Sequence, residues 1–224
     1  NYFQSSVIDF DKDRSDRSTY KLLGGSIGFY GSTLNTRQYA TKGYLEKLIA
    51  QVFTGRERFE PGNPQEGYSP SPQERQSWLQ ISYMKEAYHT MGPKFTLGWM
   101  AEALYSSKNF SENYTATMMQ AGEFAPTPHS KLMYNEAFRA NQYVAAGIKP
   151  IYVLNDMFQF RTEFYGFTPI FPIKKNALNK AYYGKAFSRF EYMGEVSVIC
   201  HLPFGAISAY VNHYSSPRRE WNVG

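Results

Sequence analysis

The first residues whose types and spacing could support catalysis are Gly24-Gly25-Ser26-Ile27-Gly28, which match the G-x-S-x-G pattern of serine hydrolases. In that pattern the serine is the nucleophile on a sharp turn between a strand and a helix. Here Phe29 to Ser32 continue a strand-like pattern, so we expect no helix after Ser26. The glycines are better explained by close backbone approach in a sheet. A serine hydrolase that uses Ser26 is kept as a rival function, which labelling by a fluorophosphonate would support.

The other reactive side chains are one cysteine and four histidines. Cys200 and His201 are adjacent in a strand-like segment, so they point to opposite faces and cannot cooperate as nucleophile and base. His89, His129 and His213 are isolated from one another in sequence. No Cys and His cluster has zinc-ligand spacing, and a lone cysteine cannot form an intramolecular disulfide. We expect no metal, no cofactor and no catalysis in this chain.

The composition of the chain favours strands. Aromatic residues make up 17% of the 224 residues, with 19 Tyr and 17 Phe, whereas charged residues make up 19%. The net charge of +5 is spread without a block of like charges, which argues against nucleic acid as a partner. No apolar run reaches the roughly 18 residues of a transmembrane helix, so any membrane span would be of the β type.

Apolar and polar residues alternate with a period of two along most of the chain, as strands require. Eight strands are predicted, near 21–35, 44–59, 77–90, 94–106, 144–154, 157–167, 187–202 and 207–212. The apolar rows predicted to face lipid include Phe95, Leu97, Trp99, Phe158, Phe160, Phe164, Val196 and Val198. The opposite rows, predicted to face a polar lumen, include Gln159, Arg161, Glu191 and Glu195.

The connections between these strands alternate between short and long. The short ones are turn-like and lie at 41–43, 92–93, 155–156 and 203–205. The long ones are polar and lie at 60–76, 107–141 and 168–185, with another beginning after Ser215. Successive antiparallel strands place alternate connections at opposite ends, which is the asymmetry of outer-membrane barrels. A water-soluble β-sandwich or β-barrel that buries the apolar rows and binds a ligand fits the alternation equally well.

Several phrases of the sequence carry a resemblance to a known family: residues 24–30 and 32–35, Thr41-Lys42-Gly43-Tyr44, residues 55–59, and Phe138-Arg139-Ala140-Asn141-Gln142-Tyr143. On these phrases the chain resembles the carboxy-terminal barrel of the bacterial surface antigen, or BamA-like, superfamily, in the form that follows patatin-like phospholipase domains in Bacteroidetes proteins. The resemblance covers nearly all of residues 20–224. It implies an all-β, antiparallel up-and-down meander of about 8–9 long strands, the carboxy-terminal half of a sixteen-strand outer-membrane β-barrel.

The resemblance also implies a site residue. Arg139 matches the arginine at the tip of the family's inward-folded loop, although Ala140 replaces the glycine expected next. An arginine inside a lumen needs an acidic partner, and Glu163 on the second strand after the loop is the candidate. The resemblance thus predicts an Arg139–Glu163 pair that locks the loop.

The resemblance further implies a role and a location. The chain would lie in the bacterial outer membrane, where it would anchor, and help to translocate, an amino-terminal patatin-like serine phospholipase domain of the parent protein. Its partners would be outer-membrane lipid, that passenger domain and the outer-membrane assembly machinery, with self-association through open strand edges. A barrel for two-partner secretion or membrane-protein assembly is the alternative within the family.

The predicted domain organisation is simple. Residues 1–5 resemble the remnant of a protease-cleavable expression tag, and residues 6–19 form a polar lead-in or loop. Residues 20–224 form a single β-barrel domain whose last strand is cut short.

Overall fold

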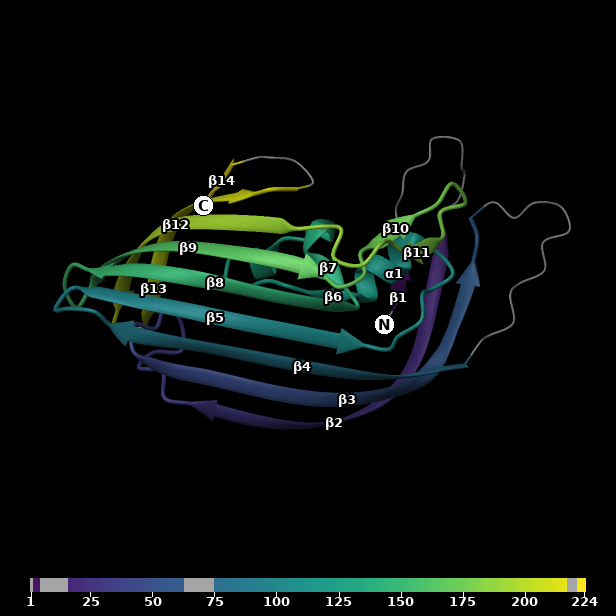
Figure 1. Cartoon of the computed structure of the whole chain (residues 1–224), viewed down its shortest axis with the longest axis horizontal. Helices are drawn as coiled ribbons and strands as arrows, with labels where there is room; N and C mark the ends of the chain where they lie inside the picture. Colours follow the sequence, from purple (N-terminus) through teal and green to yellow (C-terminus); the bar gives the residue numbers. More distant parts are fainter. Residues whose placement is uncertain (1, 5–15, 63–74, 217–220) are drawn as a thin grey trace, which may run out of the picture.

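In a computed structural model, the chain folds into one large antiparallel sheet (Figure 1). The structure describes residues 2–4, 16–62, 75–216 and 221–224. The expectations for residues 1, 5–15, 63–74 and 217–220 concern residues outside this description: parts of the tag remnant and lead-in, most of the first long connection, and the segment before the last strand. The sheet has ten strands whose spatial order follows their order in the chain. The predicted all-β, antiparallel meander is confirmed.

Eight long strands form the body of the sheet, as the period-two pattern predicts. Their bounds are β2 (Arg17–Ser32), β3 (Gly43–Glu60), β4 (Arg75–Thr90), β5 (Phe95–Ser106), β8 (Gln142–Val153), β9 (Phe158–Pro169), β12 (Glu191–Leu202) and β13 (Gly205–Tyr214). Two short strands flank them, β1 (Tyr2–Gln4) beside β2 and β14 (Trp221–Val223) beside β13. Because β1 pairs with Arg17–Thr19, part of the segment predicted as a tag remnant lies in the sheet, and β2 begins before residue 20.

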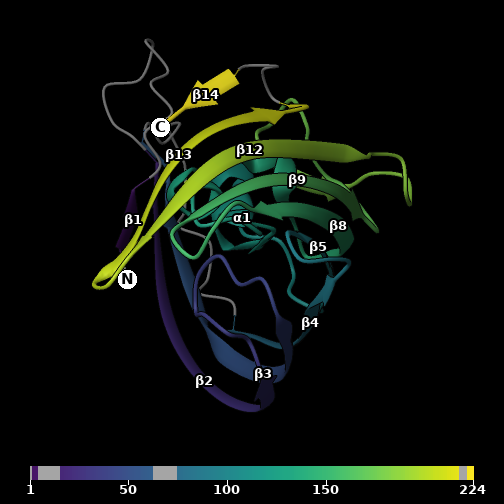
Figure 2. The same cartoon turned by 90° about the vertical axis from the view of Figure 1, so that its left-hand side faces the viewer.

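The sheet is strongly curved but not closed (Figure 2). Strands β1 and β14 stand at its two ends and do not pair with each other. The described strands therefore form an open trough and not a complete barrel.

The long connections carry short elements of their own. Residues 107–141, called the inner loop, hold α1 (Tyr114–Gln120), β6 (Gly122–Glu123), η1 (Ser130–Leu132), η2 (Glu136–Phe138) and β7 (Arg139–Ala140). The connection between β9 and β12 holds β10 (Ile173–Lys175) and β11 (Ala181–Tyr183). α1, β10 and β11 lie toward one end of the sheet, at the right of Figure 1, β6 and β7 lie nearer its middle, and the short connections lie at the other end. The predicted alternation of short and long connections is present.

One short connection is longer than predicted. The sequence places a turn at 41–43, but β2 ends at Ser32 and β3 begins at Gly43, so residues 33–42 form a connector that reaches under the inner side of the sheet. Asn35 shapes this connector, because its side-chain oxygen accepts from the backbone N–H groups of Thr41 and Lys42, at 3.0 and 3.1 Å. An Asx turn bonds the backbone two residues on, whereas these bonds span six and seven residues. The sequence therefore does not reveal that Asn35 holds the connector.

The two faces of the sheet have opposite chemistry. We call the face that packs against the inner loop the inner face and the opposite one the outer face. Cross-strand partners share a face, so Phe160 opposite Val198 and Tyr152 opposite Phe160 join the apolar rows into one continuous outer surface. The side chains of this surface are exposed, with Phe164 and Val196 each at 53%.

The inner face is buried where the inner loop covers it. Phe124 and Phe138 of the loop pack on Tyr143, Phe167 and Tyr214 of the sheet, with ring centroids 5.6–6.2 Å apart. Aromatic packing thus fixes the loop near the end with long connections. Toward the other end the inner face becomes polar.

Candidate functional site

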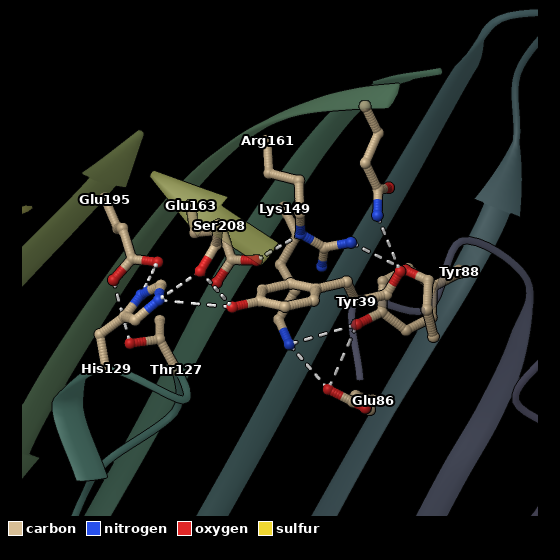
Figure 3. A network of polar contacts seen from close by, with 12 residues as sticks. Tyr39, Glu86, Tyr88, Thr127, His129, Lys149, Arg161, Glu163, Glu195 and Ser208 are labelled. Carbon is tan, nitrogen blue, oxygen red and sulfur yellow. Dashed lines mark hydrogen bonds and ion pairs between the residues drawn. The ribbon is translucent and has the colours of Figure 1, made fainter. Parts of the chain in front are cut away.

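Polar and charged side chains meet on the inner face near the short connections (Figure 3). They come from the connector, the inner loop and strands β4, β8, β9, β12 and β13, so segments far apart in sequence converge there. Ten residues form the group: Tyr39, Glu86, Tyr88, Thr127, His129, Lys149, Arg161, Glu163, Glu195 and Ser208. We call them the polar network.

Two ion pairs form one part of the polar network. Arg161 Nε lies 2.9 Å from Glu163 Oε1, and Lys149 Nζ lies 2.7 Å from Glu86 Oε2. Arg161 and Lys149 are 2% and 4% exposed. Buried charges are costly unless they are paired, so each of these cations depends on its carboxylate. Arg161 also donates to the carbonyl of Ala40 at 3.0 Å, which ties the connector to β9.

Tyr39 enters the network from the connector with an unusual backbone. Its φ is +56°, a left-handed conformation that costs of the order of 1 kcal/mol for a residue other than glycine. Gln159 donates to its carbonyl at 3.2 Å, and the Arg161 guanidinium lies over its ring at 5.7 Å. Burial raises the pKa of the Tyr39 phenol, so the hydroxyl is a proton donor at neutral pH.

His129 is positioned by a short rigid segment of the inner loop. Pro126 and Pro128 restrict the backbone on both sides of Thr127. Thr127 and Ser130 form two reciprocal hydrogen bonds, in which each backbone N–H donates to the other residue's hydroxyl, at 3.0 and 3.1 Å. His129 lies inside this turn, and its ring stacks on Tyr210 of β13 with centroids 3.5 Å apart.

The His129 ring links a carboxylate to a hydroxyl. Its Nδ1 lies 2.9 Å from Glu195 Oε1, and its Nε2 lies 3.0 Å from Ser208 Oγ. Thr127 Oγ1 donates to the second oxygen of Glu195 at 3.1 Å. Tyr39 Oη donates to Ser208 Oγ at 3.1 Å. The acceptor on Nδ1 selects the tautomer with the proton on Nδ1, so Nε2 is free to accept the proton of Ser208.

A cavity of about 1090 Å³ adjoins the network on the inner side of the sheet. Its wall includes Tyr39 and Pro128, the neighbour of His129, together with Arg161 and Lys149. Charged side chains of both signs line it, so it is a polar space.

Outside the strands, burial shifts two further groups. Lys108 at the start of the inner loop is 8% exposed, and its Nζ lies 5.0 Å from the centroid of the Trp78 ring. Burial lowers its pKa to about 8, partly offset by the carboxylate of Glu57. Burial and a hydrogen bond to Glu136 raise the pKa of Tyr114.

No family model, curated protein or solved structure matches the chain. Within the described residues, no His, Cys, Asp or Glu group is placed to hold a metal ion. In the same part of the chain, every helix is too short or too polar to cross a membrane. The chemistry of the chain is therefore inferred from the geometry of its own residues.

The structure sorts the predicted face residues onto two faces. Four residues predicted to face a lumen lie buried on the inner face: Gln159, Arg161, Glu191 and Glu195. Those predicted to face lipid lie on the outer face: Phe95, Leu97, Trp99, Phe158, Phe160, Phe164, Val196 and Val198. Their medium stays a prediction, whereas their placement on opposite faces is a fact of the fold.

The expected loop-lock pair is not formed, and this is a correction. Arg139 instead binds Glu123 of the same loop at 2.7 Å and donates to backbone carbonyls of α1 and the residue after it, at 3.2–3.5 Å. Glu163 is occupied by Arg161 and by the hydroxyl of Tyr165. Pairing β6 with β7 keeps Arg139 inside its own loop, a contact that sequence spacing does not reveal. Arg139 therefore stabilises the loop internally.

Ser26 lies in the middle of β2, exposed, opposite Gln51. The strand continues after it, as the sequence predicts, so the G-x-S-x-G match does not form a strand-to-helix turn. Sequence reasoning missed Tyr39, Thr127, His129 and Ser208. The one local signal was Pro126-Thr127-Pro128-His129-Ser130, a restricted turn with two hydroxyls and an imidazole.

Proposed function

We propose that this chain is a membrane-embedded β-sheet domain whose outer face meets outer-membrane lipid and whose inner face lines a polar lumen. The observation that carries this proposal is the reversed distribution of polarity. Charged residues such as Arg161 and Glu163 are 2% and 5% exposed, whereas Ile27 is 79% exposed. A water-soluble sheet would place these groups the other way round.

The extent of the apolar surface supports the same proposal. Exposed apolar side chains run across the outer face from Ile27 on β2 to Val223 on β14. Monomeric soluble proteins rarely expose patches beyond a few hundred Å². Along β5 the row from Phe95 to Tyr105 is long enough, at about 3.3 Å per residue, for a tilted strand to cross the hydrocarbon core.

Closure of the proposed barrel needs strands in addition to those of this open sheet. We propose that the chain is the carboxy-terminal half of a larger outer-membrane barrel of the BamA-like type. On this proposal it anchors an amino-terminal patatin-like phospholipase domain of the same parent protein. The support is the resemblance together with the uninterrupted meander and its two unlike ends. The inner loop would then occupy part of the lumen.

The test uses one charge on each kind of surface. Val196→Arg places a cation in the middle of the outer face, and Leu132→Arg places one on an exposed position of the inner loop. Refolded protein is mixed with vesicles of outer-membrane-type lipid and floated on a density gradient. A cation at bilayer depth costs about 2–4 kcal/mol, so Val196→Arg should lower vesicle binding about 30-fold or more.

Leu132→Arg should bind vesicles as the unsubstituted chain does. If the chain is a monomer without detergent and does not float with vesicles, and if both variants give the same flotation, the proposal is overturned in favour of a soluble ligand-binding β domain.

A further inference from the structure

We propose that Ser208, His129 and Glu195 form a serine esterase site, in which Ser208 is the nucleophile, His129 the general base and Glu195 the positioning carboxylate. The substrates are short-chain carboxylic esters. This departs from the sequence-based expectation of a chain without chemistry, and it does not depend on where the protein is located.

The hydrogen-bond partners fit this assignment. With the ring proton on Nδ1, His129 donates to Glu195 at 2.9 Å, and its Nε2 accepts from Ser208 Oγ at 3.0 Å. A nucleophile within hydrogen-bond reach of a base, with the base oriented by a third group, is the geometry of activated serines. Thr127 donates to the other oxygen of Glu195 and fixes that carboxylate.

The burial of the three groups also fits. The side chains of His129 and Glu195 are 8% and 1% exposed, so water competes little for their hydrogen bonds. Ser208 is only half-buried. Ser208 is thus the most exposed member of the group.

Tyr39 supplies a donor for the developing oxyanion. Its hydroxyl lies 3.1 Å from Ser208 Oγ and 3.3 Å from His129 Nε2, so it is close enough to donate to the oxyanion that forms when Ser208 attacks an ester carbonyl. The strained backbone of Tyr39 and its contacts with Gln159 and Arg161 hold this hydroxyl in place. Strain of this kind concentrates at functional sites, which gives the proposal a second and independent support.

The cavity sets the class of substrate. Tyr39 lines it and its hydroxyl contacts Ser208, whereas Ser208, His129 and Glu195 are not part of its wall, so an ester in the cavity would reach the serine only past Tyr39. Its wall combines apolar side chains, such as Leu45, Met100 and Pro126, with charged ones such as Lys131 and Glu123. A long acyl chain would have to lie against charged groups, so short acyl groups are preferred.

The reaction balances with water as the only co-reactant. Ser208 Oγ bonds to the carbonyl carbon while its proton passes to His129 Nε2, and the oxyanion accepts from Tyr39. The ester C–O bond then breaks, and His129 returns the proton to the leaving alcohol. Water adds to the acyl-serine with His129 again taking a proton. Cleavage of the acyl-serine bond releases the carboxylic acid and restores the Ser208 hydroxyl.

The first test locates the nucleophile without a substitution. Refolded protein with β-type circular dichroism is treated with a fluorophosphonate, and the modified serine is identified by peptide mass spectrometry. The expected adduct lies on Ser208. Protein that is unfolded in urea before the treatment should give no adduct on Ser208, because its reactivity requires the fold. No adduct on Ser208, or an adduct on Ser26, overturns the proposal.

The second test measures hydrolysis of p-nitrophenyl acetate and p-nitrophenyl palmitate. Ser208→Ala and His129→Gln should each lower the acetate rate by about 100-fold or more, and the palmitate should be a poor substrate. The matched control is Ser26→Ala, a serine on the inner face of β2, which should retain the rate. Equal rates for Ser208→Ala and Ser26→Ala in folded protein would overturn the proposal.

A third measurement separates positioning from folding. Glu195→Gln should lower kcat by at least about 10-fold with little change in KM, because the amide can stabilise the wrong tautomer of His129. Tyr39→Phe should also act on kcat, since its hydroxyl contacts the oxyanion and not the bound ester. A change in KM alone would assign both residues to substrate binding and contradict their proposed parts in the chemical step.

Discussion

The strands β8, β9 and β12 and the strands β2 and β3 are similar in pattern but differ in how much of their inner face is covered. In β8, β9 and β12 the inner face is covered by the inner loop and the polar network, and side chains such as Ile199 and Phe167 are fully buried. In β2 the residues from 21 to 30 are exposed on both faces. The comparison teaches that burial in this fold depends on what fills the trough and not on the length of the strands, because β2 and β3 are among the longest.

The largest expected effect comes from removing an aromatic side chain that holds the inner loop against β8, β9 and β12. Phe124→Ala should lower the free energy of unfolding by about 3–5 kcal/mol, because the Phe124 ring packs on Tyr143, Tyr165 and Phe167. Urea unfolding in detergent micelles and protease digestion of the loop measure the effect. The control, Leu132→Ala, removes a side chain of the same loop that is 84% exposed and should change little. Equal effects would contradict the filling role of the loop.

The next contrast compares a buried ion pair with an exposed one. Glu163→Gln leaves Arg161 buried without its carboxylate and should lower the free energy of unfolding by about 3 kcal/mol. Glu60→Gln removes an equivalent pair with Arg58 at 2.9 Å in β3, where both side chains are largely exposed. That change should cost no more than about 0.5 kcal/mol. Similar losses in urea titrations would show that burial does not distinguish the two halves.

A smaller contrast uses glycines. A Cβ added at Gly147 would lie 2.1 Å from Tyr165 Cδ1 and 2.7 Å from the carbonyl oxygen of Phe164. A Cβ added at Gly25 would have no heavy atom within 4 Å. Gly147→Ala should therefore cost about 1–3 kcal/mol, and Gly25→Ala should be within about 0.5 kcal/mol of the unsubstituted chain. Thermal unfolding of the two variants decides the matter, and a costly Gly25→Ala would mean that β2 is covered.

A last contrast concerns pH dependence at Lys108, whose Nζ lies 5.0 Å from the centroid of the Trp78 ring. Its pKa is lowered to about 8 in the folded chain, so between about pH 8 and pH 10.4 the unfolded chain binds more protons than the folded one. Burial of the charged ammonium therefore lowers the stability of the fold below that window, and this penalty is relieved as the pH rises through it. Lys108→Met should flatten the rise relative to the unsubstituted chain in urea titrations at several pH values. An unchanged slope would place Lys108 in water.

The strands were predictable because alternation is local. Phe158, Phe160 and Phe164 lie on one face whatever surrounds them, so eight strands and both faces follow from a period of two. The polar network was not predictable, because Tyr39, His129 and Ser208 meet only after the connector and the inner loop fold inward. The Arg139–Glu163 pair failed for the same reason, since the nearest carboxylate came from Glu123 in the loop itself.

The tie between the connector and β9 has a consequence for the order of folding. Nearly all sheet contacts join successive strands, so the meander can grow one hairpin at a time. The bond from Arg161 to the Ala40 carbonyl spans 121 residues, and that from Tyr39 to Ser208 spans 169. Such distant closures carry the largest loop entropy and the slowest approach. The bonds that tie the connector to β9 and β13 should therefore form last, after the final hairpin is in place. Until then the connector leaves the inner side of the sheet uncovered.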